Sequence, residues 1–257
     1  MTLFKFIFRT VQYPGNLRNL FKKADQRLKK FHQQLKLFKE LDGQEPSGHY
    51  ALEISPYLND ATAETFFDAH YVYHPAWAAR IIKNNGPELH IDISSTLHFC
   101  SILSAFVQTK FYDFRPADLT LSGLDCLAAD LTALPFATGS IESLSCMHTI
   151  EHIGLGRYGD PIDPRGDLKA ITELKRVCSS GGTLLIVVPV GQRKIVFNAH
   201  RIYHPADIIG MMNGFVLKDF SLVDDQGNYI ENAALDKAAE QGYGCGCFWF
   251  LKENGDR

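Results

Sequence analysis

The apolar and polar positions between residues 88 and 220 follow a pattern typical of strands that alternate with helices. The predicted strands are residues 89–93, 109–114, 121–130, 141–150 and 183–189, and the predicted helices are residues 99–107 and 167–178. Strands that are apolar on both faces are expected when helices cover both sides of a parallel sheet. The pattern therefore predicts an α/β fold built on a doubly wound, mostly parallel sheet.

A long amphipathic helix is predicted ahead of this region, over residues 16–41. Its apolar stripe consists of Leu17, Leu20, Phe21, Ala24, Leu28, Phe31, Leu35 and Phe38, and lysines and arginines crowd the opposite face. The helix either packs on the body or on another copy of the chain, or lies on an anionic membrane surface. Asp42, Gly43 and Pro46 then break the helix, which predicts a helical extension over 1–45 and a second domain over 46–257.

Charge is distributed very unevenly between these two parts. Residues 1–39 hold ten basic residues and one acidic residue, whereas the rest of the chain holds 16 basic and 28 acidic residues. The acidic body has no basic stripe of the kind that a nucleic-acid enzyme needs, so we expect no nucleic-acid partner. No apolar run reaches the length of a membrane span. We expect a cytoplasmic protein whose basic helix contacts the inner face of a membrane or a second subunit.

The six cysteines do not suggest a disulfide framework, which is consistent with a reducing compartment. Cys245 and Cys247 form a C-x-C pair, but no second Cys or His pair lies nearby at a metal-ligand spacing. The pair is better explained as part of a terminal strand. The sequence therefore predicts no metal site.

Three carboxylates close the first three predicted strands. Asp92, Asp113 and Asp130 each come at a strand end, and the carboxyl ends of such strands are where ligands bind in parallel sheets. The spacing from Asp92 to Asp113 suits a carboxylate that accepts both hydroxyls of a ribose. Each of them could equally cap a following helix.

Two longer stretches carry a family resemblance. DLTALPFATGSIESLSCMHTIEHI, followed by ITELKRVCSSGGTLLIVVP, resembles the class I S-adenosylmethionine-dependent methyltransferases, which have a Rossmann-like sheet. The run from DAHYVYHPAWAARII to GRYGDPIDPRGDL is similar to a little-characterised methyltransferase-like family associated with surface-polysaccharide genes. The resemblance implies that Asp113 binds the ribose of S-adenosylmethionine and that Phe114 faces the adenine. It also implies that Asp130 and the Leu131 amide bind the edge of the adenine ring.

The turn after the first strand departs from this family. Three glycines are usual there, and Ser94, Thr96 and His98 occupy their positions. Ser and Thr are strained where φ is positive, although their hydroxyls could bind the carboxylate of the cofactor. His98 fits only if it points away along the helix. The predicted cofactor site comprises Asp92, Ser94, Ser95, Asp113, Phe114, Asp130 and Leu131.

The candidate catalytic residues follow the fourth strand. His148 is the better candidate for a base that deprotonates a substrate hydroxyl, whereas Glu151 and His152 lie beside the cofactor or brace the neighbouring helix. A His/His/Glu metal site has no recognised spacing here. The loop over 154–167 suits a lid that binds a hydroxylated substrate through residues such as Arg157 and Asp160. Upstream and downstream histidines, which could also face the pocket, are His70, His74, His200 and His204.

The resemblance implies methyl transfer from S-adenosylmethionine to an oxygen of a small or glycan-linked acceptor. Two alternatives stay open at this point. The chain could be a non-catalytic binding or scaffold protein with a methyltransferase fold, or a metal-assisted hydrolase that uses the histidine cluster.

Overall fold

The computed structural model describes residues 14–43 and 50–254. These residues fall into two units, one up to Phe66 and the other from Phe67 onward. The first unit contains α2, Pro14–Asp42, which confirms the predicted N-terminal helix. Several of its apolar side chains are exposed, including Phe21 at 70%. No described helix has the length and apolarity to cross a membrane. The contacts of this helix and the 45/46 domain boundary stay predictions.

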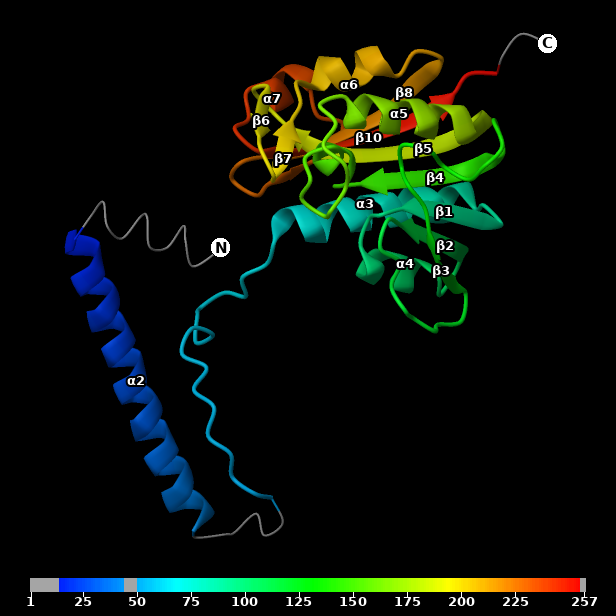
Figure 1. Ribbon diagram of the computed structural model, residues 1–257. Coiled ribbons are helices and arrows are strands. Elements are labelled where there is room, and N and C mark those ends of the chain that lie inside the picture. Colours follow the sequence, from blue (N-terminus) through cyan, green and yellow to red (C-terminus); the bar gives the residue numbers. More distant parts are fainter. Residues whose placement is uncertain (1–13, 44–49, 255–257) are drawn as a thin grey trace. The chain divides into compact units, whose positions relative to one another are not determined.

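The second unit is built on an eight-stranded sheet (Figure 1), whose spatial order is β3-β2-β1-β4-β5-β10-β8-β9. The strands are β1 Leu89–Ile93, β2 Gln108–Asp113, β3 Leu124–Ala128, β4 Ile141–Met147, β5 Cys178–Val190, β8 Phe215–Val223, β9 Tyr229–Ile230 and β10 Gly244–Lys252. Strands β1 to β5 pair in parallel, whereas β10 pairs antiparallel to both β5 and β8. The sheet is mostly parallel, as predicted.

Helices cover both faces of this sheet. The two core clusters contain helices α3 Ala69–Asn85 and α4 Leu97–Leu103 in one, and α5 Gly166–Val177, α6 Pro205–Met211 and α7 Leu235–Ala239 in the other. Strand β5 serves both clusters, because successive side chains of a strand point to opposite faces. Leu184 and Ile186 belong to the cluster with α5, and Leu185 and Val187 to the cluster with α3. The doubly wound arrangement is therefore confirmed.

Local capping sets where the helices next to the site begin. The Asp68 side chain accepts a hydrogen bond from the Tyr71 amide and caps α3, and Thr96 does the same for α4 through the Phe99 amide. Because of the Thr96 cap, α4 starts earlier than the predicted helix over 99–107.

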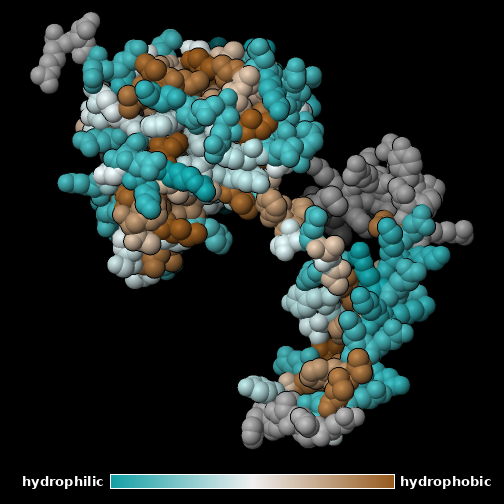
Figure 2. Space-filling view, turned by 180° about the vertical axis from the view of Figure 1, so that it is seen from behind, coloured by the Kyte–Doolittle hydropathy of each residue, from teal (hydrophilic) through white to brown (hydrophobic). Residues whose placement is uncertain are grey.

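In the described chain, loops rather than helices connect β2 to β3 and β3 to β4. The predicted strand over 121–130 shortens to β3, because Gly123 and the turn at Asp130 stand at its ends. Figure 2 shows several patches of apolar surface on this unit, and Ile102 on α4 and Leu127 on β3 are among its exposed apolar side chains. With no helices in these connections, the ends of β2 and β3 border an open pocket.

The remaining short elements lie next to β5 and next to one another. They are the 3-10 turn η1 Ile150–His152 and the hairpin of β6 Lys194–Val196 with β7 His200–Ile202.

Candidate active site

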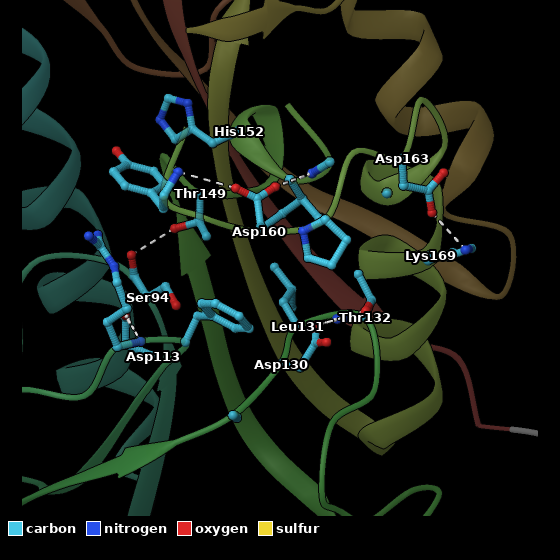
Figure 3. A pocket seen from close by; sticks show the side chains of 18 of the residues that line it. Ser94, Asp113, Asp130, Leu131, Thr132, Thr149, His152, Asp160, Asp163 and Lys169 are labelled. Carbon is cyan, nitrogen blue, oxygen red and sulfur yellow. Dashed lines mark hydrogen bonds and ion pairs between the residues drawn. The ribbon is translucent and has the colours of Figure 1, made fainter. Parts of the chain in front are cut away.

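A pocket of about 460 Å³ lies at the carboxyl ends of β1 to β4 (Figure 3). The turns that follow these strands form its floor, and the loop over 154–166, which we call the lid, forms one wall. The predicted site residues that line the pocket are Ser94, Ser95, Asp113, Phe114, Asp130, Leu131, His148 and His152. Asp92 and Glu151 do not line it and are buried. The structure thus brings together residues that four different strand ends contribute.

The turn after β1 keeps its shape without glycine. Ser94 has a φ of 56°, a conformation that glycine adopts without strain. Its amide donates to the Tyr112 carbonyl at 2.7 Å, and the Thr149 hydroxyl donates to the Ser94 carbonyl at 2.7 Å (Figure 3). Tertiary hydrogen bonds from two neighbouring strands therefore hold this serine in the left-handed region.

The buried Asp92 stabilises the same turn through hydrogen bonds. Its carboxylate accepts hydrogen bonds from the Ser95 amide at 3.0 Å, from the Ser95 hydroxyl at 2.6 Å, and from the Ser145 hydroxyl. Complete burial raises the pKa of Asp92, while these hydrogen bonds act in the opposite direction. The predicted role of Asp92 in cofactor binding is consequently indirect in this structure, because the residue shapes the turn.

A buried histidine extends this network into the sheet. His90 on β1 lies 2.8 Å from the hydroxyls of Ser143 and Ser145 on β4. Since the Ser145 hydroxyl donates to Asp92, its oxygen must accept from His90 Nε2–H, and the Ser143 hydroxyl donates to Nδ1. Burial lowers the pKa of His90 to about 3, so the ring is neutral at pH 7. We call this chain from Ser143 to Ser95 the serine–histidine relay.

At the other two positions where the resembled family usually has glycine, the side chains do not enter the pocket. Thr96 caps α4, and the His98 side chain is exposed and does not line the pocket. The steric conflict that His98 raised in the sequence does not arise.

Asp113 and Asp130 each bend the loop that follows their strand. One oxygen of Asp113 accepts the Arg115 amide at 2.7 Å. One oxygen of Asp130 accepts both the amide and the hydroxyl of Thr132, at 2.8 and 2.7 Å. In both cases the hydrogen bonds orient the carboxylate at the rim of the pocket (Figure 3).

A salt-bridged clamp fixes the loop between β3 and β4. Arg176 and Glu173 on α5 form a salt bridge, with Arg176 Nε 2.7 Å from Glu173 Oε1. Glu173 accepts the Leu134 amide, and Arg176 donates to the carbonyls of Leu134 and Phe136 at 3.0 and 2.7 Å. This clamp positions the segment next to Leu131.

The predicted catalytic residues meet at the end of β4. His148 has a φ of 55°, which is uncommon for residues other than glycine, and its Nδ1 lies 2.9 Å from Glu151 Oε1. The same carboxylate oxygen is 3.7 Å from His152 Nε2. His152 Nδ1 donates to the Ala199 carbonyl at 2.6 Å, and burial lowers the pKa of His152. Glu151 therefore orients two imidazoles that both line the pocket.

The lid is organised by its own residues. Asp160 accepts hydrogen bonds from the amides of Gly154, Gly156 and Tyr158. The Tyr158 ring lies under the guanidinium of Arg115 at 4.7 Å and under that of Arg157 at 5.0 Å. Asp160 and Arg157, which the sequence suggested for substrate binding, take part in lid contacts in this structure.

Some pocket residues were not singled out in the sequence. Thr132, Thr149 and Lys169 line it, and Lys169 pairs with Asp163 at 2.7 Å (Figure 3). Thr132 comes shortly after a predicted strand, Thr149 lies in the last residues of one, and Lys169 lies one helical turn into α5, and these positions were the available signal. Of the histidines suggested for the pocket, His204 caps α6 instead, and His70 stacks on His148 at 5.6 Å between ring centroids.

Comparisons with known proteins agree with this fold. The N-methyltransferase NodS of Bradyrhizobium japonicum, bound to S-adenosylhomocysteine, is 12% identical with a TM-score of 0.51, over 79% of this chain and 94% of that one. The 1,6-didemethyltoxoflavin-N1-methyltransferase of Burkholderia thailandensis, bound to 1,6-didemethyltoxoflavin and S-adenosylhomocysteine, is 11% identical with a TM-score of 0.52, over 71% of this chain and 79% of that one. The chain has the class I methyltransferase fold.

At such low sequence identities, a shared fold does not show that two proteins share an activity. SpnF, a cyclase, is also similar, at 14% identity and a TM-score of 0.50 over 70% of this chain and 81% of that one. Residues 136–244 match the family described as Caenorhabditis protein of unknown function, DUF268. No curated protein matches the sequence significantly. The association with surface-polysaccharide genes stays a prediction.

Proposed function

We propose that the protein is an S-adenosylmethionine-dependent methyltransferase that acts on an oxygen of a small or glycan-linked acceptor. The observation that supports this most is the single pocket that joins the turns after β1, β2 and β3. Its volume of about 460 Å³ lies within the range of pockets that enclose ligands of cofactor size. The scaffold alternative would not require a pocket there.

The residues at hand fit this cofactor. The carboxylate of Asp113 would hold the ribose hydroxyls, Phe114 would face the adenine, and Asp130 with the Leu131 amide would bind the adenine edge. Ser94 and Ser95 border the pocket where the methionine portion would lie, and their turn is already fixed by Asp92. When bound, S-adenosylmethionine would supply an electrophilic methyl group.

For the acceptor, we propose that His152 takes up the hydroxyl proton. Its Nδ1–H is fixed on the Ala199 carbonyl, which leaves Nε2 unprotonated, and its lowered pKa keeps the ring neutral at pH 7. Glu151, 3.7 Å from Nε2, would stabilise the imidazolium that forms. His148 is less suited to this role than the sequence suggested, because its Nε2 lies 3.4 Å from the Cys245 sulfur.

Calorimetric titration with S-adenosylhomocysteine tests the proposal. We expect micromolar binding to the wild-type protein and a loss of roughly ten- to a hundredfold in Asp113→Ala, since a hydrogen bond to a charged group contributes about 1.5–3 kcal/mol. Asp118→Ala is the matched control, because Asp118 is an exposed carboxylate on the same loop that does not line the pocket. Absence of heat and of a thermal shift at millimolar ligand would refute the proposal and favour a non-catalytic protein.

A further inference from the structure

Three potential metal ligands from distant parts of the chain converge beside the pocket, and one of them, His148, lines it. His70 lies in the first turn of α3, His148 follows β4, and Cys245 lies on β10. One ligand atom of each lies within 4.8 Å of the other two. We propose that His70, His148 and Cys245 bind a zinc ion, a site that does not depend on the proposed methyl transfer.

The distances suit a tetrahedral zinc site. His148 Nε2 and the Cys245 sulfur are 3.4 Å apart. Two such atoms bound to one zinc ion at the usual bond lengths are about 3.6 Å apart. A small rotation of the His70 side chain would bring its ring nitrogen within bonding distance of the same ion, since this residue is only half-buried. Two imidazoles and one thiolate favour zinc over magnesium or calcium, which prefer oxygen ligands.

Glu151 supports His148 in the way that carboxylates support metal-binding histidines. It lies 2.9 Å from His148 Nδ1, so it holds the proton on that nitrogen and leaves the Nε2 lone pair on the side of Cys245. The left-handed backbone of His148 is a further sign that its orientation matters, since strained residues are usually found where function requires them.

Charge balance gives an independent argument. Glu151 is 1% exposed, and its Oε2 has no hydrogen-bond partner among the described residues. Within the described part of the chain, Glu151 forms ion pairs with two histidines, His148 at 2.9 Å and His152 at 3.7 Å. A buried carboxylate is costly unless positive charge lies nearby. A divalent cation bound by the Cys245 thiolate, with Glu151 next to it, would leave the group without net charge.

The proposed site has three protein ligands, which leaves a fourth coordination position for water or substrate, as in catalytic zinc sites. His148 also lines the pocket described above. Without a metal, the Cys245 thiol would instead donate a hydrogen bond to His148 Nε2, which is the competing explanation for the 3.4 Å distance.

The test is zinc binding by the full-length chain. Protein stripped with a chelator is titrated calorimetrically with zinc alone, and a cobalt(II)-substituted sample is examined for thiolate charge-transfer absorption. We expect one zinc ion per chain and a cobalt–thiolate band. Cys245→Ser should weaken zinc binding at least a hundredfold and remove the band, and Glu151→Gln should weaken binding about ten- to a hundredfold.

Cys247→Ser is the matched control. Cys247 is equally buried on the same strand, 3.9 Å from the Cys245 sulfur, but lies outside the ligand group. Its zinc affinity should equal that of the wild type. His70→Gln, a change at a half-buried position, should weaken binding while leaving the urea midpoint unchanged, which separates loss of a ligand from loss of fold. Absence of stoichiometric binding, or binding that Cys245→Ser leaves intact, would overturn the proposal.

Discussion

Mild acid should destabilise the protein through His90. The ring is fully buried, and burial lowers its pKa from 6.5 to about 3. Below pH 6.5 the unfolded chain takes up a proton on this histidine that the folded protein accepts only near pH 3, so the equilibrium shifts toward unfolding as the pH falls. One pKa unit corresponds to about 1.4 kcal/mol, so His90 should lower the free energy of unfolding by about 2 kcal/mol between pH 7 and pH 5.

Urea unfolding of the wild type and of His90→Gln at both pH values isolates this effect. Glutamine has a donor and an acceptor for Ser145 and Ser143 but does not titrate. The free energy of unfolding of the wild type should therefore fall by about 2 kcal/mol more than that of the variant. His98→Gln, which removes an exposed histidine, should behave as the wild type. If the free energy of unfolding falls by the same amount in the wild type and in His90→Gln, protonation of the buried His90 ring is not the cause of the acid sensitivity.

Two further predictions concern the pocket walls. A Cβ on Gly154 would lie 1.9 Å from the Asp163 carbonyl, whereas one on Gly159, also at positive φ, meets nothing within 4 Å. Gly154→Ala should thus displace the lid and weaken S-adenosylhomocysteine binding more than tenfold. Gly159→Ala should lower stability by only about 1–2 kcal/mol. Equal affinities of the two variants for S-adenosylhomocysteine in calorimetry would contradict this prediction. Arg176→Met removes hydrogen bonds to two loop carbonyls and should lower stability by about 1–3 kcal/mol in urea unfolding, and an unchanged midpoint would argue against the clamp.

The fold was largely predictable because β5 contains a continuous apolar run and β1 has apolar residues at alternate positions. The predicted strand over 183–189 lies inside β5, and the one over 89–93 coincides with β1. Asp113 and Asp130 could be placed for the same reason, since Asp113 ends β2 and Asp130 comes two residues after β3, and the ends of these strands share one edge of the sheet.

The serine–histidine relay and the proposed zinc ligands could not be predicted in this way. His90 and Ser145 look like ordinary strand residues until the pairing of β1 with β4 sets them side by side. Cys245 approaches His148 only because β10 inserts between β5 and β8. Strand order in a sheet depends on long-range packing, which cannot be read from the spacing of residues along the sequence.

The position of β10 also has a consequence for the order of folding. During synthesis, β5 and β8 leave the ribosome well before β10, which must then enter between them and pair with both. Until it does, the backbone groups on one edge of β5 have no partner, and such an edge can join strands of other chains. We therefore expect the nascent chain to be prone to aggregation until β10 pairs with both β5 and β8.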